Sequence, residues 1–195
     1  LRQTLERHPG QIQALLTARS LAEPTTPESL EKRWQEYLSE VDGEPALHSA
    51  LRRFRMESQF RIIWRDLMRW ADLSETMAAT SAFADICIDG ALNWLYRDAC
   101  EQYGTPRGAD PVTGQEANQK MVVLGMGKLG GRELNVSSDI DLIFVYPESG
   151  STRGGPRSVT NDEFFTRLCR RLVHVLGANT ADGFVFRVDM NLRPY

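Results

Sequence analysis

The chain has 195 residues, of which 42% are hydrophobic and 25% are charged, and its formal net charge is -3. This length suits one domain or two small ones, and the composition excludes a collagen-like chain, a disulfide scaffold and a wholly disordered protein. No apolar run approaches the roughly 18 residues of a membrane span, and the net charge provides no basic field for nucleic acid, so we expect neither partner.

The first part of the chain has a helical pattern. Residues 1–45 are polar and interrupted by prolines, so we expect short helices and loops there. Apolar residues then follow a 3.6-residue period, which predicts amphipathic helices over residues 47–71 and 75–103. The segment 104–119 is rich in glycine, proline, aspartate and asparagine, and this composition predicts an exposed linker.

The first of these helices contains many arginines. Arg61, Arg65 and Arg69 share one face because they are four residues apart. We expect a solvated face, and the alternative is a face that contacts a phosphate or an acidic partner. The same helix has three further arginines: Arg52, Arg53 and Arg55.

In the second part of the chain, short strand patterns alternate with one helix. We expect a buried strand over residues 120–124, a second strand over 139–146 and an alternating strand over 184–190. Residues 147–159 contain glycines and prolines that predict a loop. A helix over 160–177 begins at a capping-box pattern and ends at a glycine.

The cysteines and the chain ends indicate the setting of the protein. Cys87, Cys100 and Cys169 are odd in number and lie among apolar residues, which favours buried thiols in a reduced, cytoplasmic setting over a disulfide or zinc site. The chain starts with Leu1 and ends at Tyr195, directly after a strand-like segment. We therefore expect a fragment of a longer protein.

Three aspartates form the main chemical signal. Asp139 and Asp141 are two residues apart on a predicted strand, so they point to one face with Cα atoms roughly 7 Å apart. Such a pair needs a counter-charge, and a hard divalent cation, Mg2+ or alternatively Mn2+, supplies it. Asp189 lies opposite the apolar side of the last strand. If the two strands are neighbours, the three aspartates converge as catalytic residues and metal ligands for a displacement at phosphorus.

A glycine-rich turn, GMGKLGG, precedes these aspartates. Gly127 and Gly130 allow backbone N–H groups to approach a phosphate, and Lys128 is either a phosphate contact or a solvent-exposed residue. The turn matches neither a Walker loop nor a dinucleotide-binding order. A turn or an aspartate pair alone would be structural, and it is their order along the chain that favours a reaction site.

This order of motifs resembles the nucleotidyltransferase superfamily that includes DNA polymerase β. Within it, LGMGKLGGRELNVSSDIDLIF and DGFVFRVDMNLRP are similar to segments of the bacterial glutamine synthetase adenylyltransferase/adenylyl-removing enzymes. LRRFRMESQFRIIWRDL resembles that family as well, and the resemblance covers about residues 47–195. It implies an α+β fold, with a helical N-terminal region over 1–115 and a polymerase β-like palm core over 116–195. This core is a small mixed sheet with flanking helices, truncated at its C-terminal end.

The resemblance also implies an activity. The family has two similar halves, one that removes AMP from a tyrosine of glutamine synthetase and one that attaches it, and this chain is more similar to the removing half. Removal is phosphorolysis, in which orthophosphate releases ADP. The implied partners are glutamine synthetase, the PII signal protein in its uridylylated form, orthophosphate and ADP or ATP. The implied nucleotide or phosphate contacts are Gly127, Lys128, Gly130, Ser138 and Arg193.

Two alternatives remain open. The same type of site could attach AMP from ATP, or the chain could be a catalytically silent module that binds glutamine synthetase or PII. The complete set of three aspartates argues against the silent module. Two positions depart from the family pattern. Lys128 stands where much of the superfamily has glycine or serine, so Ser137 or Ser138 would have to supply the usual hydroxyl contact. Asn191 stands where the removing half usually has arginine.

Overall fold

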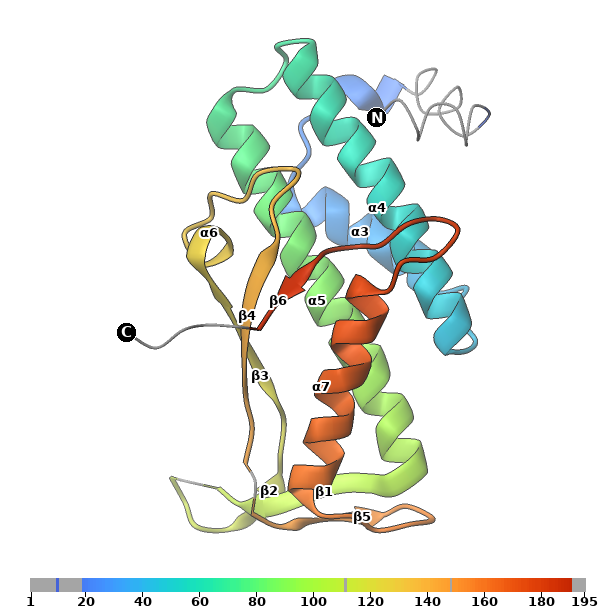
Figure 1. Cartoon of the computed structure of the whole chain (residues 1–195), viewed down its shortest axis with the longest axis vertical. Coiled ribbons are helices and arrows are strands. Elements are labelled where there is room, and N and C mark those ends of the chain that lie inside the picture. Colours follow the sequence, from blue (N-terminus) through green and yellow to red (C-terminus); the bar gives the residue numbers. More distant parts are fainter. Residues whose placement is uncertain (1–9, 11–18, 111, 148, 191–195) are drawn as a thin grey trace.

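A computed structural model describes residue 10 and residues 19–110, 112–147 and 149–190. Long helices pack beside two small three-stranded sheets (Figure 1). The α+β fold expected from the sequence is therefore confirmed. Among the described helices, none combines the length and the apolar character that a membrane crossing requires.

Three helices make up most of the N-terminal part. They are α3 (Pro27–Leu38), α4 (Glu44–Leu67) and α5 (Leu73–Tyr103), and a short 3-10 helix, η1 (Arg19–Ala22), precedes them. Helices α4 and α5 confirm the two predicted helices, although the stretch from Ala79 to Ala84 of α5 is buried on all sides rather than on one face. α4 ends earlier than expected because Arg69 adopts a φ of 56°, a left-handed conformation that cannot continue an α-helix.

An aromatic cluster joins these three helices. The ring of Phe54 on α4 lies 5.5 Å from Trp34 of α3 and 5.3 Å from Phe83 of α5, measured between centroids. Gly90 of α5 makes room for this cluster, because a Cβ atom at this position would lie 2.1 Å from the indole Nε1 of Trp34. Large buried aromatic groups contribute much of the apolar area removed from water, so this contact is central to the helical part.

The first sheet consists of segments in which we expected no strands. It contains β1 (Gly104–Ala109), β2 (Glu116–Asn118) and β5 (Ser151–Gly154), in the antiparallel order β2–β1–β5. The predictions of an exposed linker over 104–119 and of a loop over 147–159 are therefore wrong for these strands. Their sequences are short and rich in glycine and polar residues, so backbone pairing, rather than an apolar alternation, defines them.

The second sheet contains the predicted strands. Its order is β3–β4–β6, with β3 (Val122–Met126) antiparallel to β4 (Ile140–Val145) and β6 (Val188–Asp189) parallel to β4. Helix α7 (Asn161–Gly177) begins after Thr160, whose side chain accepts a backbone hydrogen bond from the first turn. The helix predicted over 160–177 is therefore confirmed.

Two details of these strands differ from the expectation. The strand predicted as buried is exposed on one face, where Val122 and Leu124 are 54% and 44% exposed. The strand expected over 184–190 is reduced to β6, because Val185 and Phe186 are both buried. Two adjacent buried side chains are incompatible with the strict alternation of a half-buried strand.

Helix α7 connects the helical part to the rest of the chain. Arg171 pairs with Glu44 of α4 at 2.7 Å and with Asp98 of α5 at 2.6 Å. The boundary predicted between residues 115 and 116 lies in the connection between β1 and β2, which pair with each other. The division into a helical region and a palm core stays a prediction.

Three arginines of α4 are buried. Arg52, Arg61 and Arg65 are each 3% exposed, so the expected solvated face is wrong for Arg61 and Arg65. Arginine can satisfy several buried carbonyls at once because its planar guanidinium has five donors. Arg65 contacts three backbone carbonyls and one carboxylate, those of Leu21, Ala22, Trp70 and Glu75.

The three cysteines are free thiols. Cys87 and Cys169 are buried and Cys100 is partly exposed, which confirms buried, unpaired thiols at two of the three positions. Burial raises the pKa of the Cys87 thiol and raises that of Cys169 to about 11, so neither is a reactive thiolate at neutral pH.

Candidate active site

The glycine turn packs directly against the strand that contains the paired aspartates. Strand β3 ends at Met126, and a single helical turn, α6 (Gly127–Gly130), follows. Gly127 has a φ of 54°, and a Cβ atom there would lie 2.7 Å from Oδ2 of Asp141. A Cβ atom at Gly130 would lie 2.6 Å from the carbonyl oxygen of Gly125. The glycines are therefore required for the turn to fold back onto β3 and for the Asp141 carboxylate to lie beside it.

Two of the three predicted aspartates are neighbours across the sheet. Asp141 of β4 pairs in register with Asp189 of β6, and on its other side with Met126 of β3. Adjacent strands lie about 4.8 Å apart, and residues in register share one face of the sheet. We expected the aspartates to converge if their strands are neighbours, and β4 and β6 are neighbours that bring Asp141 opposite Asp189.

The third aspartate has a different partner. Asp139 precedes β4, and its carboxylate accepts a hydrogen bond from Nε of Arg187, with which it forms an ion pair. Arg187 also donates to the carbonyl of Ser137 at 3.3 Å. The sequence did not predict this pairing of Asp139, although a cation two residues before Asp189 was a signal for it.

The acidic pair of Asp141 and Asp189 offers part of a site for the expected cation. Carboxylate oxygens are the ligands that Mg2+ prefers, and Asp141 and Asp189 present two carboxylates on one face. Within residues 19–110, 112–147 and 149–190, however, no three His, Cys, Asp or Glu side chains are arranged to hold a metal ion. Asp141 and Asp189 therefore fit a cation as two ligands. The counter-charge of Asp139 in this structure is Arg187.

The remaining predicted contacts lie around this turn. Lys128 is exposed on α6, and the backbone N–H of Ser138 donates to the carbonyl of Asn135 at 3.0 Å in the loop before β4. Arg193 and Asn191 lie outside the described residues. A nucleotide role for Lys128, Ser138 and Arg193 stays a prediction.

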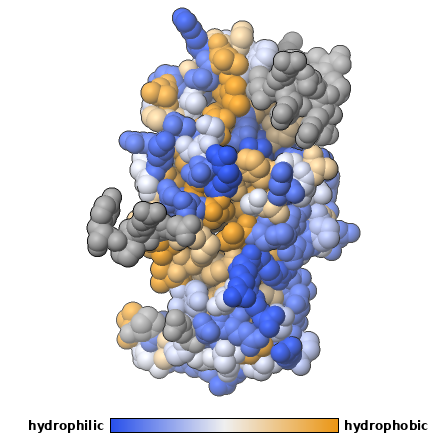
Figure 2. Space-filling model, in the orientation of Figure 1, coloured by the Kyte–Doolittle hydropathy of each residue, from blue (hydrophilic) through white to orange (hydrophobic). Residues whose placement is uncertain are grey.

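The sheet face with the acidic pair is otherwise apolar and exposed. Side chains in register with one another on β3 and β4 share this face, and Figure 2 shows apolar residues gathered there. The exposed members are Val122, Leu124, Met126 and Val145, which are 54%, 44%, 37% and 50% exposed. The acidic pair therefore lies at one end of an apolar surface, a feature that the expectation of a buried strand missed.

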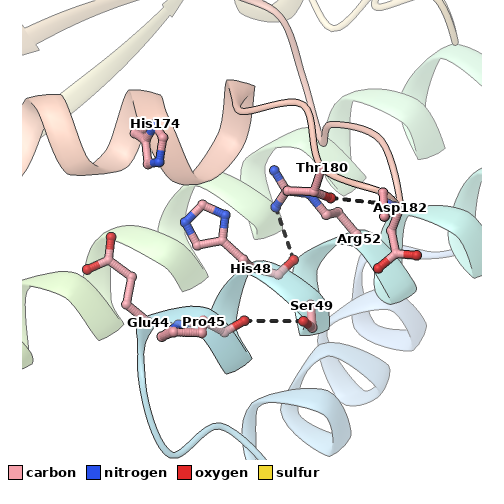
Figure 3. Close-up of a pocket in the computed structure, with 9 residues that line it drawn as sticks. Glu44, Pro45, His48, Ser49, Arg52, His174, Thr180 and Asp182 are labelled. Carbon is pink, nitrogen blue, oxygen red and sulfur yellow. Dashed lines mark hydrogen bonds between the residues drawn. The ribbon is translucent and has the colours of Figure 1, made fainter.

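A separate cavity of about 570 Å3 opens between the start of α4, the end of α7 and the loop that follows α7 (Figure 3). Its lining includes His48 and His174, whose rings lie 5.4 Å apart between centroids, and the buried Arg52. The lining contains neither the glycine turn nor the acidic pair. This cavity is therefore not part of the candidate active site, although the carbonyls that Arg52 contacts include that of Gly183, which lies five residues before β6.

Replacing Gly127 by alanine is expected to destabilise the fold by about 2–3 kcal/mol, because the new Cβ would add a clash with Asp141 to the strain of a positive φ. The matched control is Gly114→Ala, since Gly114 has a φ of 68° and open space around it. We expect the control to lose only about 1 kcal/mol. Denaturant unfolding measures both variants, and equal losses would contradict the close approach of Asp141.

Comparison with known proteins identifies the family. A profile described as glutamate-ammonia ligase adenylyltransferase matches residues 1–195. A relative from Pseudomonas aeruginosa is 56% identical over 178 residues, which cover 90% of this chain and 17% of the relative. One from Pseudomonas putida is 50% identical over 190 residues, 97% of this chain and 19% of the relative.

A third relative, from Nitrosococcus oceani, is 47% identical over 188 residues, 96% of this chain and 19% of the relative. All three are named bifunctional glutamine synthetase adenylyltransferase/adenylyl-removing enzyme. The chain spans less than a fifth of the length of these relatives. It belongs to the glutamate-ammonia ligase adenylyltransferase family.

Proposed function

We propose that this chain forms the reaction site of an adenylyl-removing enzyme that acts on adenylyl-tyrosine of glutamine synthetase by phosphorolysis. The observation that supports the proposal most is the register pair of Asp141 and Asp189 beside the glycine turn. The names of the relatives support glutamine synthetase as the substrate protein. The apolar face next to the acidic pair suits a substrate in which a phosphodiester joins an adenosine to a phenol ring.

The reaction exchanges one bond to phosphorus for another. An oxygen of orthophosphate forms a bond to the phosphorus of adenylyl-tyrosine, the bond from phosphorus to the phenolic oxygen breaks, and the proton of the hydrogen phosphate passes to that oxygen. The products are ADP and unmodified tyrosine. Because two anions must approach each other, positioning and charge neutralisation provide most of the rate.

The chain's own residues would divide this work. Asp141 and Asp189, with Asp139 released from Arg187, would hold Mg2+ or Mn2+, which neutralises charge at the phosphoryl oxygens when it is bound. Gly127 and Gly130 let the turn approach a phosphate, and Lys128, Ser138 and Arg193 are the proposed side-chain contacts. We propose that Arg187 stabilises a phosphate oxygen once Asp139 leaves it.

The same site could run the opposite chemistry. Attachment of AMP from ATP would use the same carboxylates, and the resemblance of the chain to the removing half is what favours removal. A uridylylated PII protein is the proposed activator, and the proposed location is the cytoplasm.

The experiment uses a chimera, in which this chain replaces the segment that it matches in the Pseudomonas aeruginosa relative. Adenylylated glutamine synthetase is incubated with Mg2+, with and without orthophosphate, in the presence of uridylylated PII. We expect ADP release that requires orthophosphate and that Asp139→Asn reduces. ADP release at the same rate in the Asp139→Asn variant would contradict adenylyl removal by this chain. So would a result in which Asp139→Asn reduces only the attachment of AMP from ATP.

A further inference from the structure

The last strand of the site is held in place by the segment before it. Strand β6 consists of Val188 and Asp189, and within the described part of the chain it pairs with β4 through these two residues. Two register pairs fix a strand weakly, because a short edge strand buries little surface of its own. Among the described residues, the segment that leads into β6 is 178–187, which connects α7 to β6, so the position of Asp189 depends in part on how this segment is held.

A single buried arginine from another helix holds this connection. The Nε atom of Arg52 donates to the carbonyl of Gly183 at 2.8 Å, and an Nη atom donates to the carbonyl of Val175 at 3.2 Å. Its other Nη atom donates to the carbonyl of Ala178. Figure 3 shows Arg52 between α4 and this loop, where it also donates to the carbonyl of His48. One guanidinium thus joins the end of α7 to both sides of the bend that follows.

The chain between this bend and Asp189 is fixed as well. The N–H groups of Val185 and Phe186 both donate to the carbonyl of Leu176, at 2.9 and 3.0 Å. Both side chains are buried, and the ring of Phe186 lies 5.4 Å from Phe83 of α5. The carbonyl of Arg187 then accepts a hydrogen bond from Ile140 of β4 at 3.0 Å. A displacement at the bend is therefore transmitted to β6 through ordered backbone.

We propose that Arg52 is a positioning residue, which sets the place of Asp189 opposite Asp141 by holding the connection between α7 and β6. The inference rests on the proposed function, in which Asp189 belongs to the reacting site. It requires arginine at this position, because the three donors of a lysine on one nitrogen cannot reach carbonyls on three sides of a planar guanidinium.

The same helix provides a matched control. Arg65 is also 3% exposed, and it contacts three carbonyls and a carboxylate at the opposite end of α4. Arg65→Lys removes a comparable set of buried hydrogen bonds, and none of the partners named here belongs to residues 178–187. The two lysine variants therefore separate a general loss of stability from a local effect on β6.

The first test measures hydrogen–deuterium exchange in the chain itself. We expect Arg52→Lys to speed exchange of the amides of residues 184–189 by about tenfold, whereas Arg65→Lys leaves them at the wild-type rate. This measurement is independent of any activity. Equal exchange in the two variants would overturn the inference, because Arg52 would then contribute only to global stability.

The second test measures phosphorolysis in the chimera. We expect Arg52→Lys to lower kcat by about 10- to 100-fold with little change in the KM for orthophosphate, because a shift of about 1 Å at a reacting group has an effect of this size. Arg65→Lys should retain its kcat at a temperature where both variants are folded. A kcat for Arg52→Lys that matches the control would overturn the positioning role.

Chemical rescue gives a third readout. The cavity of about 570 Å3 beside Arg52 is open to a small cation, so millimolar guanidinium should restore part of the kcat of Arg52→Ala, and methylammonium should not. Absence of rescue in a folded variant would count against the inference. If the wild-type chimera shows no phosphorolysis while the exchange difference is present, the proposed function fails and the structural link from Arg52 to β6 stands.

Discussion

Asp141→Asn is expected to reduce ADP release from adenylylated glutamine synthetase by about 1,000-fold, because loss of this carboxylate removes several kcal/mol of charge stabilisation at phosphorus. Asp141 lies between the glycine turn and Asp189, with which it is in register. No other described carboxylate has this position, so none can replace it in the variant. The measurement is the rate of orthophosphate-dependent ADP formation by the chimera of this chain with its Pseudomonas aeruginosa relative.

Asp162→Asn is the matched control for this prediction. Asp162 is an exposed carboxylate in the first turn of α7, so its substitution makes the same chemical change away from the site. We expect full activity from this variant. Comparable activity in Asp141→Asn and Asp162→Asn, with both proteins folded, would contradict the assignment of the acidic pair as the reacting site.

Gly90→Ala is expected to reduce stability strongly, with a loss of about 3 kcal/mol or more, because the new methyl group would lie 2.1 Å from Nε1 of Trp34. Trp34 is 1% exposed and packs against Phe54, so its ring has no free space into which it can move. Thermal unfolding should show a decrease in Tm of about 6–12 °C for a chain of this size.

The control for this contact is Gly177→Ala. Gly177 is the last residue of α7, and a Cβ atom there meets only the carbonyl of Phe186 at 3.6 Å, an ordinary contact. We expect this variant to keep or slightly increase its stability, because alanine is the better helix former. Similar losses in the two variants would mean that the packing of α3 against α5 does not depend on Gly90.

The helices were predictable because apolar residues recur along each of them with a period close to 3.6 residues. The stripe from Leu47 onward and the stripe that ends before Gly104 indicated α4 and α5 with bounds close to those in the structure. Strands β1, β2 and β5 were not predictable, since their glycine-rich and polar sequences match those of exposed loops. They are strands because they pair with one another, a long-range property that composition does not report.

The candidate site also has features that the sequence indicated and features that it did not. The spacing of Asp139 and Asp141 and the glycines of the turn indicated the site, and the neighbouring strands place Asp141 opposite Asp189. The ion pair of Asp139 with Arg187 depends on how two short segments align, so the sequence offered Arg187 as a nearby cation without revealing which aspartate it pairs with. The burial of Arg52 and Arg65 was missed for a related reason, because several of their carbonyl partners lie more than 40 residues away in the sequence.

The proposed reaction transfers an adenylyl group from tyrosine to orthophosphate. Radiolabelled orthophosphate tests it most directly, because phosphorolysis forms a new bond between the incoming phosphate and the phosphorus of AMP. We expect the chimera to place the label in the β-phosphate of ADP and Asp141→Asn to abolish this incorporation. Release of AMP with the label left in orthophosphate, or labelled ADP that forms equally well with Asp141→Asn, would contradict it.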